Sequence, residues 1–88
     1  MARLGLDPEQ MTALANTMKK EAGNIDAAAG RLDGKLRSTY WEGPDQKRFQ
    51  GEWDGKHKKA LKDAVKLLNE AASRINKEVS EQRQASGG

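Results

Sequence analysis

Apolar residues recur through the first half of the chain at alternating spacings of four and three. They are Met11, Ala15, Met18, Ala22, Ile25, Ala29, Leu32 and Leu36. This seven-residue repeat places large side chains on one seam of a helix and mostly alanine on the other, which is typical of a helix packed along its whole length against a neighbour. Asp7 as N-cap and Pro8 at the first helical position mark the start, so we expect a helix over residues 7–39.

A second apolar pattern runs through the later half of the chain. Its members are Phe49, Trp53, His57, Leu61, Val65, Leu68, Ala72, Ile75 and Val79, with a neighbouring row of Ala60, Ala64, Leu67 and Ala71. We therefore expect a second helix over residues 44–79 with a double-width apolar stripe, on which His57 packs at the margin of the core. Residues 1–6 are expected to form an N-terminal arm and residues 80–88 a flexible tail.

Residues 40–44 separate the two patterns and are expected to form a turn. Pro44 cannot continue a preceding helix and pushes Gly43 out of α geometry, yet it suits the first position of a new helix. Two long helices joined by so short a link must fold back on each other. The predicted fold class is all-α, an antiparallel helix-turn-helix hairpin that forms a single domain.

The apolar stripe of the second helix is wider than one neighbouring helix can cover. The surplus should meet another hairpin, so that two chains form a four-helix bundle. A core with so few large side chains also favours a partner. The pattern leaves open which seam residues pack within one chain and which pack between chains; the candidates are Met11, Met18, Ile25, Leu32, Leu61, Val65, Leu68 and Ile75.

Composition narrows the chemistry of the chain. It has 88 residues, a net charge of +3, no Cys and one His. Disulfides, thiolate chemistry and Cys-based or multi-His metal sites are excluded by these counts. No phosphate-binding loop, paired acids or activated nucleophile stands out, so we expect no enzyme activity, no cofactor and no metal. The sequence shows no cleavable signal peptide and no apolar run long enough to span a bilayer.

All the aromatic residues lie within fourteen positions around the predicted turn. They are Tyr40, Trp41, Phe49 and Trp53. One interpretation is that they close the end of the bundle by packing on Leu32 and Leu36. The other is that Trp41, on a tight turn, is an anchor for recognition by another protein.

Trp41-Glu42-Gly43 is a Trp-x-Gly turn between two helices of similar length, with Phe49 and Trp53 following on the second helix. In this arrangement, the chain resembles the WXG family of small ESAT-like proteins, which the type VII secretion system of Gram-positive bacteria handles. The resemblance covers the whole chain. It implies a helical hairpin that pairs with itself or with a second WXG-type chain, export in the folded state, and recognition by a membrane-bound secretion ATPase. Trp41 and Gly43 would form the recognition turn, supported by Tyr40, Phe49 and Trp53.

The tail departs from the family pattern. Many members carry a Tyr-x-x-x-Asp/Glu signal just after the second helix, whereas this chain has Val79 and Arg83 at the corresponding positions. Either a partner chain supplies the tail signal, or this chain uses a divergent one.

Lysines gather on one side of the second predicted helix. Lys58, Lys59, Lys62 and Lys66 share a helical face, which we name the lysine face. The simpler interpretation is a solvated surface opposite the core. The alternative is contact with an anionic surface such as a phosphate backbone, a cell-wall polymer or a membrane.

The function expected from the sequence is interaction without catalysis. The resemblance implies a protein secreted without a cleavable signal peptide, exported by type VII secretion or acting as its targeting partner. A first alternative is a chaperone or adaptor for a larger secreted toxin or effector. A second is an intracellular nucleic-acid-associated helical dimer that uses the lysine face, which the absence of a recognisable nucleic-acid module does not favour. A membrane is an alternative partner after export.

Overall fold

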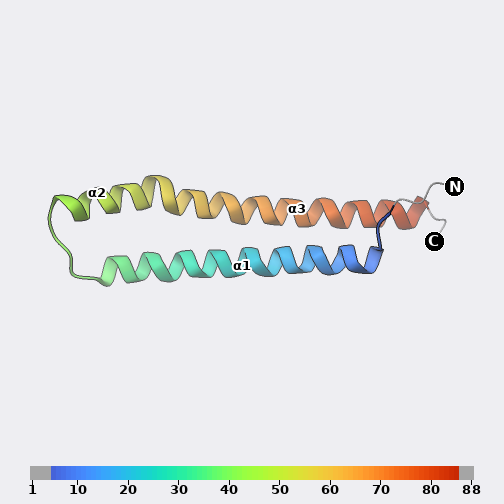
Figure 1. Cartoon of the computed structure of the whole chain (residues 1–88), viewed down its shortest axis with the longest axis horizontal. Helices are drawn as coiled ribbons and strands as arrows, with labels where there is room; N and C mark the ends of the chain where they lie inside the picture. Colours follow the sequence, from blue (N-terminus) through green and yellow to red (C-terminus); the bar gives the residue numbers. More distant parts are fainter. Residues whose placement is uncertain (1–4, 86–88) are drawn as a thin grey trace.

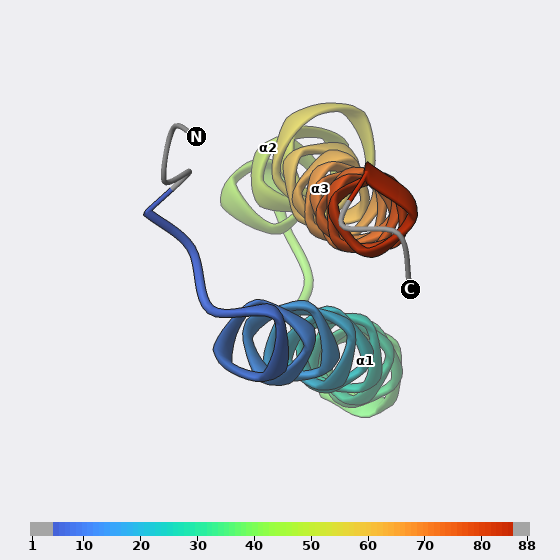
Figure 2. The same ribbon diagram turned by 90° about the vertical axis from the view of Figure 1, so that its right-hand side faces the viewer.

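The computed structural model describes residues 5–85, which form a long helical hairpin and contain no strand. Helix α1 spans Pro8–Ser38, and the returning arm consists of α2 (Pro44–Glu52), a π-helical turn η1 (Trp53–His57) and α3 (Lys58–Ala85). The two arms run antiparallel, side by side, and form a rod with dimensions of 67 × 17 × 15 Å (Figures 1 and 2). The predicted all-α hairpin is confirmed.

The helix boundaries follow from local sequence signals. The Asp7 carboxylate accepts hydrogen bonds from the backbone N–H groups of Glu9 and Gln10, at 2.8 and 3.1 Å, and thereby caps α1 as predicted. The helix ends at Ser38, and Pro44 begins the second arm at its first helical position. Gly43 caps that arm with φ +117° and ψ 178°, a conformation that is open essentially to glycine alone.

The contact between the arms is made mainly by alanine. Ala15, Ala22 and Ala29 of α1 are buried, and they are seven residues apart along one line of the helix. Ala72 and Val79 are buried in the same way on α3, and Trp53 is buried in η1. Small side chains let the two backbones approach closely, so the hairpin holds together through a narrow seam.

Two sequence-based expectations about the second arm are wrong. Residues 80–85 were expected to belong to a flexible tail but continue α3 to Ala85, because Glu, Gln, Arg and Ala are good helix formers and the side chain of Glu81 lies one turn from Lys77. His57 was expected to pack at the core margin, yet its imidazole is exposed, 3.8 Å from the Glu52 carboxylate. Residues 86–88 of the expected tail, and 1–4 of the expected arm, lie outside the described residues.

The π turn explains the position of His57. The backbone N–H of Lys58 donates to the carbonyl of Trp53, five residues earlier, so this turn holds one residue more than an α-helical turn. The inward-facing position after Trp53 is therefore Lys58 rather than His57. Beyond this point Leu61, Leu68 and Ile75 recur at spacings that a regular α-helix keeps on one side.

Candidate interaction site at the Trp-x-Gly turn

Two aromatic side chains pack against each other at the turn end of the hairpin. Trp41 lies in the non-helical link, and its ring centroid is 5.8 Å from that of Phe49 on α2, with the ring planes tilted by 47°. Both are partly exposed, at 43% and 42%. Tyr40 is 85% exposed and does not belong to this group. A tilted aromatic pair of this kind stabilises a fixed geometry while leaving ring surface for a partner.

These rings form part of an apolar cleft at the hairpin end of the molecule. The cleft has a volume of about 340 Å³. We name it the aromatic cleft; its lining residues are Leu32, Lys35, Leu36, Thr39, Trp41, Phe49 and Trp53. The structure thus places Trp41, Phe49 and Trp53 around one cleft with Leu32 and Leu36, the arrangement that the first of the two interpretations describes. It places Tyr40 outside the cleft.

A carboxylate on α1 holds Trp53 in place. The indole Nε1 of Trp53 donates a hydrogen bond of 2.9 Å to Asp33 Oδ1, and the residue is only 8% exposed. Arg37 Nε donates to the other carboxylate oxygen at 3.1 Å, and Lys58 Nζ lies 3.5 Å from Oδ1. The indole hydrogen bond, followed by that of Arg37, lowers the pKa of the Asp33 carboxyl from 3.8 to about 2.

The cluster around Asp33 extends into the π turn. Arg37 Nη2 donates to Asp54 Oδ1 at 3.2 Å, and Gln50 Nε2 donates to Asp54 Oδ2 at 3.0 Å. We name Asp33, Arg37, Asp54 and Lys58 the Asp33 cluster. It was missed by the sequence analysis, although the i,i+4 spacing of Asp33 and Arg37 next to Leu32 gave a local signal for part of it.

One side of the hairpin leaves most of its apolar side chains incompletely covered. In two antiparallel right-handed helices, residues three after or four before a buried seam position lie on the same side of the contact. This criterion places Leu32 and Leu68 together, because they flank Ala29 and Ala72. We name this side the open face; the criterion assigns to it Met11, Met18, Ile25 and Leu32 of α1 with Leu68 and Ile75 of α3. Neighbouring apolar residues on the same side extend it, namely Leu14 of α1 and Leu61, Ala64, Leu67 and Ala71 of α3.

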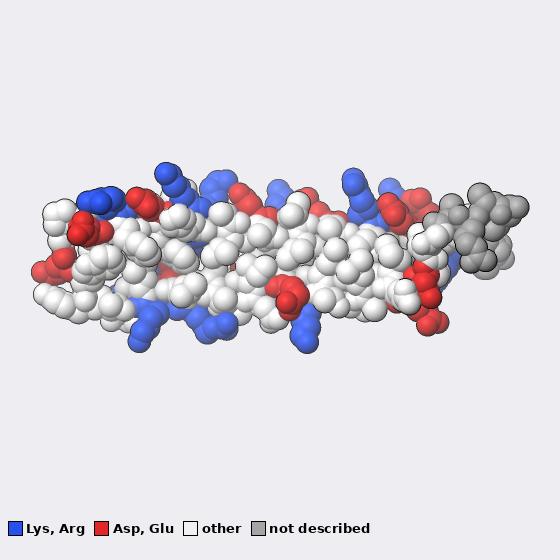
Figure 3. All heavy atoms as spheres, in the orientation of Figure 1, with Lys and Arg blue, Asp and Glu red and all other residues white. Residues whose placement is uncertain are grey.

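Figure 3 shows uncharged residues along the middle of this view of the rod, with most Lys, Arg, Asp and Glu side chains at its margins. Of the predicted seam residues, Leu32 is 54% exposed and the others are half-buried, so none is fully covered within this chain. Leu67, from the neighbouring row, is 66% exposed. The aromatic cleft shares Leu32 with the open face and so continues it to the hairpin end.

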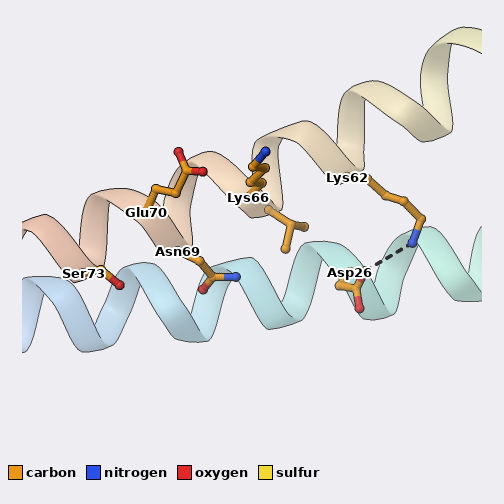
Figure 4. A pocket seen from close by; sticks show the side chains of 7 residues that line it. Asp26, Lys62, Lys66, Asn69, Glu70 and Ser73 are labelled. Carbon is orange, nitrogen blue, oxygen red and sulfur yellow. Dashed lines mark ion pairs between the residues drawn. The ribbon is translucent and has the colours of Figure 1, made fainter.

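The opposite side of the hairpin is polar. Asp26 and Lys62 approach to 3.9 Å across a groove of about 600 Å³ between α1 and α3 (Figure 4). Val65, predicted as a seam residue, lines this groove together with Asn69, whose side chain points toward α1 in Figure 4. Polar residues and an ion pair therefore lie along the side of the hairpin away from the open face.

Most of the lysine face is engaged in ion pairs within the chain. Lys58 pairs with Asp33, Lys59 with Asp63 at 3.3 Å, and Lys62 with Asp26. Lys66 lines the polar groove, and no ion pair is formed by it within residues 5–85. The acidic partners reduce the positive potential that this surface offers to an anion.

Comparison with known proteins assigns no family to the chain. No family model matches it, and neither a curated protein nor a solved structure is significantly similar to it. Within residues 5–85, no helix is both long and apolar enough to cross a membrane.

Proposed function

We propose that this chain is a small interaction protein of a type VII secretion system, exported by it or serving as a targeting partner, as its resemblance to the WXG family implies. The observation that carries the proposal is the position of Trp41. It lies in a Trp-x-Gly link between the arms of a helical hairpin, packs on Phe49 and keeps 43% of its surface exposed. A half-exposed tryptophan in a fixed setting is a typical anchor for a protein partner.

Gly43 supports the same proposal through its backbone. Its φ of +117° lets the chain enter α2 directly after the link, and a Cβ there would have space but not an accessible conformation. The glycine therefore serves the geometry of the turn, and Trp41 supplies its exposed surface. This division of roles gives a physical reason for a Trp-x-Gly motif at the junction of two helices.

We further propose that the open face pairs with a second hairpin, of this chain or of a similar one, to form a four-helix bundle. The molecule exposes 6812 Å², whereas a compact monomer of this mass exposes about 5,100 Å². A stable protein interface buries about 1,600 Å² in total, which a face of this length can supply. Half-buried side chains along both arms provide the apolar area for it.

Export measurements test the recognition role of Trp41. Trp41→Ala should lower the amount of protein in the culture medium at least tenfold in a Gram-positive host with an active type VII system, to the level seen when its secretion ATPase is deleted. The matched control is Glu42→Ala, an exposed neighbour in the same turn. If Trp41→Ala is folded and is exported as well as the wild type, the proposal is wrong.

A chaperone for a larger exported toxin would use the same open face, and the observation that favours it is that Val79 and Arg83 stand where many family members have the Tyr and Asp/Glu of the export signal. In that case, the chain alone would not reach the medium, and co-expression of the toxin would restore export. The nucleic-acid alternative has less support, because three lysines of the lysine face are already paired with aspartates. Absence of duplex binding at about 50 mM salt would exclude it.

A further inference from the structure

We propose that Asp33 is a positioning residue for the aromatic cleft: its contacts with Trp53 and Lys58 select the π turn, and the π turn sets the direction in which α2 presents Phe49. This inference rests on the proposed function in taking the cleft as the recognition surface. The effect of Asp33 on the π turn and on Trp53 is a property of the hairpin alone and is tested separately.

The π turn changes the helical phase between the aromatic rings and the apolar side of α3. Trp53 and Leu61 are eight residues apart, which places them about 80° apart on a regular α-helix, and Phe49 and Leu61 would be about 120° apart. One additional residue in the intervening turn reduces both angles to about 20°. The π turn therefore brings Phe49 and Trp53 into line with the apolar side of α3. Without it, both rings would rotate by about 100° away from the positions they hold in the cleft.

Asp33 contacts the two residues that close the π turn. Trp53 begins η1 and Lys58 follows it, and the backbone N–H of Lys58 closes the π hydrogen bond to Trp53. The side chains of these same two residues both reach Asp33 Oδ1, at 2.9 and 3.5 Å. On a regular α-helix, residues five apart point about 140° from each other, so their side chains leave the helix in diverging directions and reach one oxygen less readily. A single carboxylate that accepts from both therefore favours the π geometry.

The second arm has little intrinsic preference for a regular α-helix at this point. Gly51 lies near the end of α2 and Gly55 lies within η1, and each lowers helix stability by about 1 kcal/mol relative to alanine. A π turn is rare because its hydrogen bonds are less favourable than those of an α-helix. Contacts from outside the arm must select it, and Asp33, with Arg37 bridging to Asp54, supplies them from α1.

The test follows Trp53 in a Trp41→Phe background. The chain has two tryptophans, so Trp53 is then the one that remains. Asp33→Ala should move the indole N–H resonance of Trp53, shift its fluorescence to longer wavelength, and speed amide exchange at Lys58 about tenfold, as expected for loss of one hydrogen bond. Asp33→Asn keeps an acceptor oxygen and should restore the Trp53 signals. Asp26→Ala is the control, since it removes a different, exposed carboxylate of α1, one that pairs with Lys62 outside η1.

A deletion separates selection of the π turn from a local hydrogen bond. Lys56 is exposed, and deleting it removes the additional residue, so the arm becomes a continuous α-helix with the same phase on both sides. In this background, Asp33→Ala should change the Trp53 fluorescence clearly less than in the full chain. An equal change in both backgrounds would show that Asp33 does not act through the turn.

A second variant covers the case in which Asp33→Ala does not fold. Trp53→Phe keeps an aromatic ring but lacks the indole donor, and it should speed amide exchange at Lys58 in the same way. If neither variant alters exchange there while the far-UV circular dichroism stays that of a helical protein, the positioning role is wrong.

Export of the same variants distinguishes the two proposals. If the Asp33→Ala substitution displaces Trp53 and also lowers export, both the positioning role and the proposed function are supported. If Trp53 is displaced and export stays normal, the positioning role stands and the cleft is not the recognition surface. If Trp53 keeps its wild-type signals, the positioning role fails, whatever the export of the variant, and Trp41→Ala still tests the proposed function.

Discussion

At the scale of single residues, two positions carry most of the local structure at the turn. Gly43 adopts a backbone conformation that other residues avoid, and Asp33 collects donors from three different side chains. Both lie next to the aromatic cleft without contributing an aromatic ring to it. The structure of this end of the molecule therefore depends on Gly43 and Asp33 as well as on the aromatic residues.

Gly43→Ala should destabilise the hairpin by about 1–3 kcal/mol, because a Cβ strains the backbone at positive φ even where space is available. Urea unfolding followed by circular dichroism measures the change. Gly34→Ala serves as the control, since this glycine lies within α1. Equal stability of Gly43→Ala and wild type would mean that the turn adopts another conformation in solution.

Asp33 should also give the hairpin a stability that depends on acid pH. Its pKa is about 2 in the folded chain against 3.8 for an ordinary Asp, so its contribution is present above pH 3.8 and is lost as the pH falls towards 2. The melting temperatures of wild type and Asp33→Asn should therefore differ near neutral pH and converge in strong acid. Asp45→Asn, which removes an exposed pair with Arg48, is the control.

At the scale of elements, α1 is a continuous helix whereas the second arm contains a change of helical geometry. The α1 helix keeps one seven-residue repeat from end to end, and its buried alanines follow it. The second arm begins with spacings of four, at Phe49, Trp53, His57 and Leu61, which drift by about 40° per step on a regular helix. The π turn absorbs this drift, and the regular repeat resumes beyond it.

Glycines inside α1 provide a test at this scale. Gly23 and Gly30 are exposed, and a Cβ built on either meets no atom within 4 Å. Gly23→Ala and Gly30→Ala should therefore each stabilise the chain by about 1 kcal/mol, through helix propensity alone. Thermal unfolding measures this gain. A loss of stability would instead indicate that a partner helix packs closely on this side of α1.

At the scale of the whole molecule, the hairpin is a thin rod with one contact between its arms and an open face along both of them. In light scattering, the purified chain should have twice its 9.7 kDa mass. Leu32→Asp should abolish this dimer, since a buried unpaired charge costs several kcal/mol. Ala27→Asp, at an exposed position on another side of α1, should leave it intact. A compact wild-type monomer would contradict the pairing proposal.

The sequence is sufficient to predict the hairpin because its signals are local. The cap at Asp7, the break at Pro44 and the repeat through Ala15, Ala22 and Ala29 each depend on neighbours in the chain. The aromatic cleft is predictable in outline, since its rings follow from the register of the arms.

The Asp33 cluster and the π turn are not predictable in the same way. Asp33 and Trp53 are twenty residues apart and meet only once the hairpin has formed. The exposure of His57 is a consequence of that meeting, because the stripe of apolar spacings contains no signal for an extra residue in a turn. Long-range hydrogen bonds of this kind decide a local geometry that periodicity alone assigns to a regular helix.

The extra residue in the second arm affects how this chain should be compared with others. A relative whose second helix is α-helical throughout would reach the same placement of an indole over an α1 carboxylate with one residue fewer between that indole and the leucine that follows. An ungapped alignment would then match only one half of the arm. Searches that permit a single gap between Trp53 and Leu61 should align both halves.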